Sequence, residues 1–407
     1  MEEEEIQLRR LARALPLRRR FERLTVQDMV KAEKLRRILL LIAFKLGRCK
    51  DSEKEEGLQR ALRLGYAKYL HIAYFKPTIL APPARVDRDI ESFSDSDCYI
   101  FFRFTKPHLR ELLVLLKLDI EEEDVEFDNN EHMRGEEIFL RGLYELVSGE
   151  TQHKIATNVF GRDGSSQSRA LLFFINHMFD NFAKLIQGNV QWWYDNNFFS
   201  MSAKAIGEKL GLDDEGMTNL VSHFIDCNCL ETERVGGGPA ESGANAARWD
   251  PNIQRAFYNG WKSKTGLKHQ TVDDAFGFTM DCYGPTSLRR NDLVLLRESD
   301  INDIFARLQL AAEIDYVIFG DSAYKRQSHL RSYYSEREFE EADGLPRWNR
   351  HMKRLRISIE WNYGHQGSMF RYLTTHFKMK ILSSSATTKV FIVTTLLRNL
   401  HTGYYGS

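Results

Sequence analysis

The sequence predicts an α/β protein in which an all-α N-terminal region precedes a domain of strands and helices. Up to about residue 185, apolar residues recur at helical spacing, with capping residues and glycines between the segments. After about residue 200, short apolar runs typical of strands alternate with helical segments. We therefore expect four parts: a helical region at 1–80, a linker and helix with an acidic spacer at 81–131, a helical domain at 132–195, and an α/β domain at 200–400.

The composition limits the class of protein. The 407 residues, 43% of them hydrophobic, are enough for a large core, and Lys plus Arg equal Asp plus Glu at 57 each. Five cysteines without a CxxC pair argue against a zinc knuckle or a disulfide framework and fit a reducing compartment. The longest apolar run, at 38–44, is too short to span a bilayer, and the N-terminus has no signal-peptide pattern. We expect a soluble intracellular protein with no membrane partner.

Charge is unevenly distributed along the N-terminal third of the chain. Seven arginines lie at 9–23, a run that suits either a solvated helix face or a phosphate-binding surface. Eight acids at 119–131 predict a solvated spacer. Between these runs, residues 104–118 predict an amphipathic helix with Thr105 as its N-cap and Pro107 in its first turn.

The segment at 132–195 predicts a compact helical block. Three helices are expected, at 134–149, 151–161 and 165–186. A short helix, a glycine turn and a longer helix form the helix-turn-helix pattern, in which the second helix enters the major groove of DNA by its N-terminal residues. Here the residues able to bond phosphates or base edges are Ser166, Gln167, Ser168 and Arg169. A plain three-helix bundle without DNA contact fits the same pattern.

Two acids in the C-terminal half follow strand-like runs. Such runs are expected at 220–231, 276–284 and 315–324, with helices near 201–217, between 291 and 313 and after 347. Asp226 ends the apolar run VSHFI, and Asp321 directly follows YVIFG. A carboxylate in that position leaves a buried strand at the mouth of the sheet, where it is held rigidly. Because Asp is also a common turn residue, neither position is decisive alone.

A third acid, Glu360, lies in the helical and strongly basic stretch at 347–364. Arg356 and Glu360 are four residues apart and share one helix face, which suits either a surface ion pair or a catalytic carboxylate beside a phosphate-binding cation. If the three acids converge, like-charge repulsion requires a cation between them. Carboxylate oxygens suit Mg²⁺ or Mn²⁺, and two such ions about 4 Å apart can promote attack at a phosphodiester.

The motifs around these acids resemble the DDE transposase and integrase superfamily, and more narrowly Harbinger-type transposases and the nucleases derived from them. The offsets of that family's last acidic motif hold here at Asn349, Arg356, Glu360, Tyr363–Gly364 and Phe370–Arg371. The stretch FGDSAY at 319–324 is similar to the family's GDSGY motif, and the segments at 258–272 and 283–299 are similar to its connecting segments. The resemblance covers about residues 130–400.

The resemblance implies an RNase H-like fold at 200–400, preceded by a helix-turn-helix DNA-binding domain at 132–195. It implies metal-dependent hydrolysis of phosphodiesters in double-stranded DNA, at transposon ends or a target, followed by strand joining in a working transposase. Asp226, Asp321 and Glu360 would hold two divalent ions, Mg²⁺ or Mn²⁺. The residues that would hold DNA phosphates are Arg350, Lys353, Arg354 and Arg356. We expect Asp292 to be structural or to contact the residues that hold the metal, and His269 to be a surface or substrate-side residue and not a ligand.

Some features depart from the family pattern. Cys227–Asn228 replaces the usual Gly-Thr after the first aspartate, and Gly367 replaces a lysine that often follows the last glutamate. A glycine-rich insertion at 235–250 is expected to be a loop.

Several alternatives stay open at the level of the whole protein. A domesticated, non-transposing DNA-binding or scaffolding protein of the same fold is one, and a phosphate-binding or interaction protein without catalysis is another. Residues 1–130 carry no recognisable motif, so packing on the nuclease domain, dimerisation into a homodimer and partner binding are all open for them. The family implies a Myb-like helper protein, and the DNA substrate implies the nucleus.

Overall fold

The computed structural model describes residues 39, 58–62, 88–119, 125–127, 131–211, 221–234, 251–310, 315–340, 345–375, 379–381 and 386–406. Met1–Arg85 and Val86–Ser407 are two compact units, and nearly all of the described residues belong to the second. The basic run at 9–23 and the glycine-rich stretch at 235–250 lie outside the described residues.

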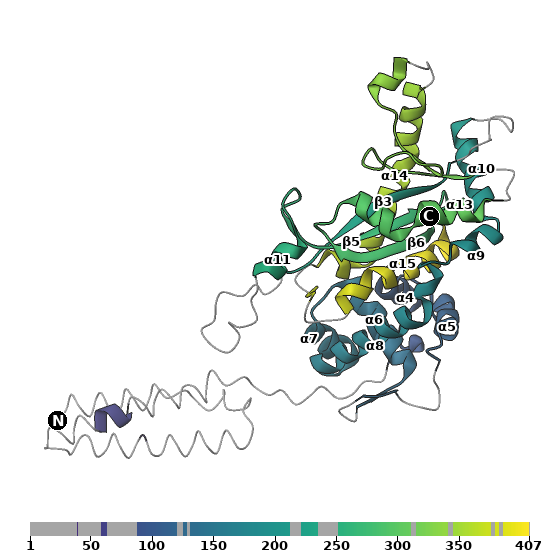
Figure 1. Ribbon diagram of the computed structural model, residues 1–407. Helices are drawn as coiled ribbons and strands as arrows, with labels where there is room; N and C mark the ends of the chain where they lie inside the picture. The colour runs from purple at the N-terminus through teal and green to yellow at the C-terminus, as the bar shows by residue number, and fades with distance from the viewer. Residues whose placement is uncertain are drawn as a thin grey trace. The chain divides into compact units, whose positions relative to one another are not determined.

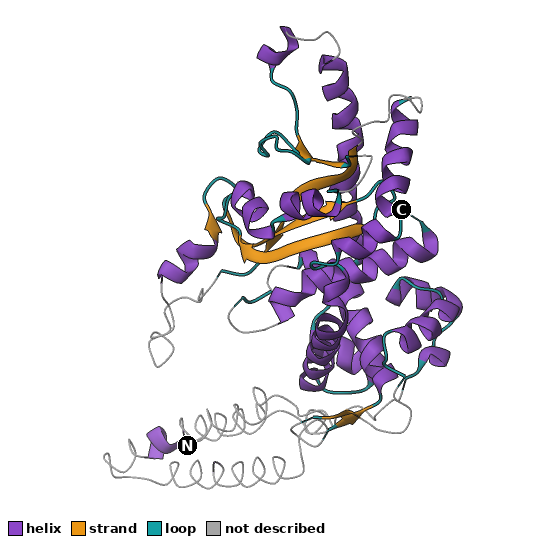
Figure 2. Cartoon of the chain, turned by 45° about the vertical axis from the view of Figure 1, so that its right-hand side comes forward, coloured by secondary structure: helices purple, strands orange, loops and turns teal. Residues whose placement is uncertain are grey.

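A mixed sheet of six strands forms the centre of the second unit (Figures 1 and 2). The strands are β3 (Val221–Glu231), β4 (Tyr258–Asn259), β5 (Lys264–Asp273), β6 (Thr279–Ser287), β7 (Val317–Phe319) and β8 (Leu330–Arg331). The strand order is β4-β5-β3-β7-β8, and β6 also pairs with β5. Strand β5 is antiparallel to β3, β4 and β6, whereas β7 is parallel to β3 and to β8. A separate ribbon joins β1 (Val125–Glu126) to β2 (His132–Met133).

Helices surround this sheet. The α-helices are α4 (Asp95–Phe102), α5 (Lys106–Leu115), α6 (Gly135–Ser148), α7 (Gln152–Ile155), α8 (Gly164–Phe182), α9 (Val190–Asp195), α10 (Phe198–Leu210), α11 (Pro251–Phe257), α12 (Asp292–Ser299), α13 (Ile301–Leu308), α14 (Leu345–Met369) and α15 (Ala386–Tyr405). Shorter helical turns are η3 (Ile90–Ser92), the π-helical η4 (Ala156–Phe160), η5 (Ala183–Leu185), η8 (Glu336–Glu340) and η9 (Arg371–Thr374). No helix in the described ranges is long and apolar enough to span a bilayer.

The largest hydrophobic core joins the helices of residues 95–182 to the C-terminal helix. Phe102, Phe139, Phe174 and Phe391 are fully buried in it. Helix α15 packs against both α8 and β6, so it lies between the helical layer and the sheet (Figure 1). The helices expected to form a domain of their own at 132–195 therefore share one core with the C-terminal end of the chain.

Two smaller cores cover opposite faces of the sheet. Ile225 packs with Phe305 in the core beneath α9, α10 and α13. Phe224 and Phe319 pack with Ile359 of α14 on the other face. Since successive strand residues point to opposite faces, Asp226 shares the face of Phe224, on which α14 lies.

Several local predictions can be compared directly with the structure. Helix α5 has Thr105 at its N-cap position, and α6 ends at Gly149, whose φ of 62° lies in the left-handed region that favours glycine. The prediction for His269 is wrong. This side chain is fully buried in β5 and stacks on Phe391 with ring centroids 4.3 Å apart, and burial lowers its pKa to about 3.

Candidate functional site

The helix pair predicted to bind DNA is present, but two of its predicted DNA-contacting side chains are buried. Helix α7 runs on into η4, and α8 begins after Asp163, whose carboxylate accepts the Ser166 N–H at 2.8 Å. Ser166 and Gln167 are 1% and 0% exposed. Gln167 donates to Glu145 at 2.9 Å and accepts from Arg141 at 2.9 Å. With both side chains buried, the structure does not support the prediction that Ser166 and Gln167 contact DNA.

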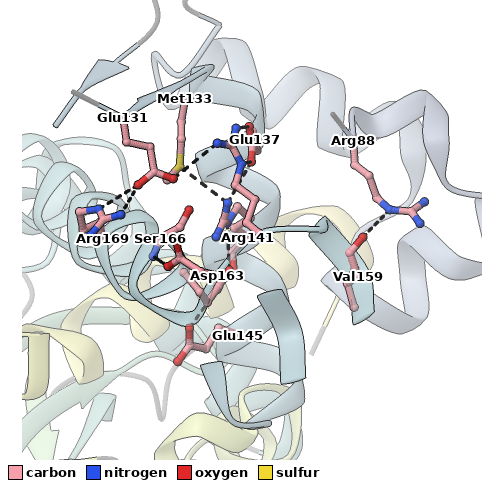
Figure 3. Close-up of polar contacts among 12 residues, drawn as sticks. Arg88, Glu131, Met133, Glu137, Arg141, Glu145, Val159, Asp163, Ser166 and Arg169 are labelled. Atoms are coloured by element: carbon pink, nitrogen blue, oxygen red, sulfur yellow. Dashed lines mark hydrogen bonds and ion pairs between the residues drawn. The ribbon is translucent and has the colours of Figure 1, made fainter. Parts of the chain in front are cut away.

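Several charged side chains of this helix pair and of α6 form an ion-pair network (Figure 3). Arg169 Nε donates to Glu131 at 3.0 Å, and Arg162 lies 3.4 Å from the same carboxylate. The fully buried Glu137 accepts from Arg141 at 2.9 Å and from Arg162 at 2.7 Å. Glu131 is thus part of a structural network, although it was expected in a solvated spacer. Of the four predicted DNA contacts, only Ser168 is exposed, so a DNA-reading helix-turn-helix is not supported.

The two candidate aspartates lie at neighbouring positions of adjacent parallel strands. Asp226 is inside β3 and not at its end, whereas Asp321 follows the C-terminal end of β7. Phe224 of β3 lies opposite Phe319 of β7, and Asp226 and Asp321 follow two residues further along. Burial raises the pKa of Asp226, and the negative charge of Asp321 adds to that rise. Backbone N–H groups orient both carboxylates: Cys227 donates to Asp226 at 2.7 Å, and Ala323 donates to Asp321 at 2.9 Å. The sheet therefore holds the two acids side by side.

Arg356 joins the third candidate acid to the first. Its Nη1 donates to Asp226 Oδ2 at 2.8 Å, and its Nη2 donates to Glu360 Oε1 at 2.6 Å. Its Nε donates to Tyr333 Oη at 3.3 Å. Burial disfavours the charge of Arg356, but these partners outweigh burial and raise its pKa. Arg356 was predicted to hold DNA phosphates, whereas the structure places its guanidinium between two candidate catalytic carboxylates.

The side chains of the three acids are of the kind that binds divalent cations. Carboxylate oxygens are the ligands that Mg²⁺ and Mn²⁺ prefer, and a cation, the Arg356 guanidinium, already bridges two of the three acids. Within the described ranges, however, no group of three or more His, Cys, Asp or Glu lies close enough to hold a metal ion.

Polar side chains on both faces of the sheet lie next to the segment of β3 that carries Asp226. Tyr363 of α14 donates to the Asp226 carbonyl at 3.1 Å and lies 2.7 Å from the Thr271 hydroxyl. On the opposite face, the buried Lys268 donates to Asp292 at 2.7 Å, which is a structural contact. Cys227 replaces the family's glycine, and its Sγ lies 3.4 Å from Tyr324 Oη.

The basic residues of α14 lie on an exposed part of the helix. Figure 1 shows the N-terminal half of α14 standing clear of the sheet. Arg350, Lys353 and Arg354 are exposed there and form no ion pair with another described residue. Their predicted contact with DNA phosphates stays a prediction that this exposure allows.

Lys262 was missed by sequence reasoning. It lies in the turn between β4 and β5, with its Nζ 2.9 Å from Cys229 Sγ. The hydrogen bond to Cys229 is the main cause that raises the Lys262 pKa, and the charges of Asp292 and Asp226 contribute to the rise. The signal that could have found it is the Asn-Gly pair at 259–260, which is typical of a tight hairpin.

Comparison with known protein families matches part of the chain to a family model. Residues 245–399 match the family model described as DDE superfamily endonuclease. No curated protein and no solved structure matched the chain. The matched segment contains Asp321 and Glu360, whereas Asp226 precedes it. The mixed sheet with flanking helices is compatible with an RNase H-like fold. Together, the match and the fold support a DDE-type, transposase-derived nuclease.

Proposed function

We propose that the chain is a metal-dependent DNA endonuclease of the transposase type, with Asp226, Asp321 and Glu360 as its catalytic acids. The observation that supports it is that the two aspartates follow paired positions of adjacent parallel strands. The endonuclease family match supports the reaction class. The Harbinger subtype, strand joining and nuclear location belong to the same proposal and follow from the sequence resemblance.

Each residue has a separate role in this proposal. Asp226 and Asp321 would hold two divalent ions, Mg²⁺ or Mn²⁺, and Glu360 would complete the site. When bound, such ions supply activation of the attacking hydroxyl and stabilisation of the leaving oxygen. Arg356 keeps counter-charge on Asp226 and Glu360. Arg350, Lys353 and Arg354 would bind the phosphates of double-stranded DNA along α14.

A second candidate function is DNA binding or scaffolding without cleavage. The observation that favours it is the Arg356 bridge, which occupies Asp226 and Glu360 together. Among the described residues, no group of three or more His, Cys, Asp or Glu lies close enough to hold a metal ion, which also favours the function without cleavage.

Plasmid nicking in Mg²⁺ or Mn²⁺ tests the first proposal. We expect the wild-type chain to nick supercoiled DNA, and Asp321→Asn and Glu360→Gln to lose nicking while keeping the wild-type circular dichroism spectrum. Asp303→Asn, at an exposed acid of α13, is the matched control and should nick like wild type.

Two outcomes would change the assignment. Nicking that survives in Asp321→Asn and Glu360→Gln would place the activity elsewhere. Absence of nicking by the wild-type chain, with DNA binding retained, would favour the non-cleaving alternative.

A further inference from the structure

The hairpin between β4 and β5 carries an almost fully exposed tryptophan. Residues 260–263 form the turn, and Trp261 is 95% exposed, the highest value among the large hydrophobic side chains of the described residues. Exposed indole surface contributes no hydrophobic stabilisation to the fold. The position of Trp261 is therefore better explained by contact with another molecule than by packing.

The shape of this turn is fixed by the protein itself. Asn259 Oδ1 accepts the Lys262 N–H at 3.0 Å, and Asn259 Nδ2 donates to the Leu288 carbonyl at 2.9 Å. Lys262 Nζ reaches Cys229, three residues beyond Asp226 on β3, at 2.9 Å. The turn is thus tied to the strand that carries the first candidate acid, and the Lys262 ammonium interacts electrostatically with Asp226.

Cationic side chains lie in the turn and on the two segments that hydrogen bonds connect to it. Lys264 pairs with Glu231 at 2.7 Å, but Arg255 of α11 and Arg289 after β6 are exposed and have no acidic partner among the described residues. Ser287, at the end of β6, donates to the Ala256 carbonyl and so connects these two segments. An exposed aromatic ring flanked by cations is the arrangement with which proteins bind unpaired nucleotides, because the ring stacks on a base while the cations hold the backbone.

We propose that Trp261 stacks on an unpaired base of the DNA substrate next to the bond to be cut, while Lys262 and Arg255 hold the neighbouring phosphates. This inference rests on the proposed DNA-cleaving function. It commits to a single-stranded or locally unpaired segment, since the faces of bases inside a duplex are already covered by their neighbours. Stacking of this kind tolerates any base sequence, so no knowledge of the target sequence is needed to test it.

Binding of a single-stranded oligonucleotide that carries one 2-aminopurine tests the proposal with the full chain, in EDTA so that no cleavage occurs. We expect wild type to bind it with a change in 2-aminopurine fluorescence. Trp261→Ala should bind about ten-fold or more weakly and lose that change, whereas Trp261→Phe should keep part of both. Leu310→Ala is the matched control, because Leu310 is 85% exposed on a different segment, and it should bind like wild type.

The outcomes separate this proposal from the proposed nuclease activity. If Trp261→Ala binds the oligonucleotide as tightly as wild type with the same fluorescence change, Trp261 meets no base and the proposal fails, even if the plasmid is nicked. A wild-type chain that does not bind the oligonucleotide also overturns it and leaves a protein partner as the occupant of the turn. Stacking at Trp261 without any nicking supports this inference while the nuclease proposal fails.

Discussion

The positive charge of Arg356 offsets the negative charges of Asp226 and Glu360 at the candidate site. We expect removal of that charge to affect Asp226 most. The two side chains are 16% and 19% exposed and 2.8 Å apart. We expect Arg356→Gln to lower the free energy of unfolding at pH 7 by about 1–3 kcal/mol, because Asp226 is left partly buried without a counter-charge. Chemical denaturation at pH 7 measures this change.

The double variant Arg356→Gln/Asp226→Asn is the control for that prediction. A neutral amide needs no counter-charge, so we expect the double variant to recover part of the lost stability. If the two substitutions instead destabilise additively, the Asp226–Arg356 pair is not the source of the loss.

Asp274 should make stability depend on pH. Burial, followed by the nearby charge of Asp273, raises its pKa from 3.8 to about 7, although the Phe278 and Phe276 N–H groups and Arg398 oppose the rise. Between these two pH values the folded chain holds a proton that the unfolded chain releases, so stability falls as pH rises. We expect Asp274→Asn to raise the free energy of unfolding at pH 8 by at most on the order of 4 kcal/mol, with little effect near pH 4.

Thermal unfolding at pH 5 and pH 8 measures this effect. The difference between the melting temperatures at the two pH values should shrink in Asp274→Asn and stay unchanged in Asp303→Asn, whose side chain is exposed. An unchanged difference in Asp274→Asn would show that Asp274 does not titrate in this range.

Single site residues could be predicted from the sequence where the residues next to them along the chain carry the signal. Asp226 and Asp321 could be identified because each directly follows an apolar run. The pairing of Arg356 with Asp226 could not, since these residues are 130 positions apart and meet only when α14 packs on β3. The sequence predicts a DNA contact for Gln167 because no residue next to it along the chain indicates its contacts with Arg141 and Glu145.

At the scale of elements, helix α6 depends on a glycine for its contact with α8. A Cβ at Gly142 would lie 2.3 Å from Cδ1 of Phe174, which is fully buried. Glycine in a helix interior normally costs about 1 kcal/mol relative to alanine. We nevertheless expect Gly142→Ala to destabilise the protein by about 1–3 kcal/mol, because overpacking outweighs helix propensity.

Gly364 of α14 provides the matched control for that prediction. A Cβ at Gly364 would meet no atom within 4 Å apart from its own helix backbone and chain neighbours, so Gly364→Ala should stabilise the protein by up to about 1 kcal/mol. Denaturation curves of both variants decide between the two effects. Equal shifts of the same sign would contradict the packing argument.

Elements were predictable where hydrophobic patterning was strong. Strand β3 was expected at 220–231 and is found at Val221–Glu231. Strand β5 was missed, although it pairs with three other strands, because its buried stretch includes Lys268, His269 and Gln270 and so lacks an apolar run. Those polar side chains are accommodated by tertiary partners, among them Asp292 for Lys268 and Phe391 for His269.

At the scale of the whole molecule, the shared core could not be read from the sequence. Helix α15 lies more than 200 residues after α8, yet Lys389 contacts Asn176 of α8 at 2.9 Å. On its other side, Asn399 exchanges hydrogen bonds with the backbone of Thr279 in β6 at 2.8 and 3.0 Å. The periodicity of apolar residues predicts each helix separately, but it contains no information about which helices pack together in one core.

The position of α15 in the shared core predicts how truncated chains will unfold. Because Val86–Ser407 is a compact unit, we expect it to fold without residues 1–85 and to unfold in a cooperative transition, as measured by circular dichroism during heating. A second chain that ends at residue 385 lacks α15 and with it Phe391 and Val393, both fully buried in the largest core. It should not unfold cooperatively, because the helical layer and β6 would both lose the helix that packs between them. Cooperative unfolding of the chain that ends at residue 385 would mean that the helices of residues 95–182 and the sheet are stable without α15, as the predicted separation into two domains requires.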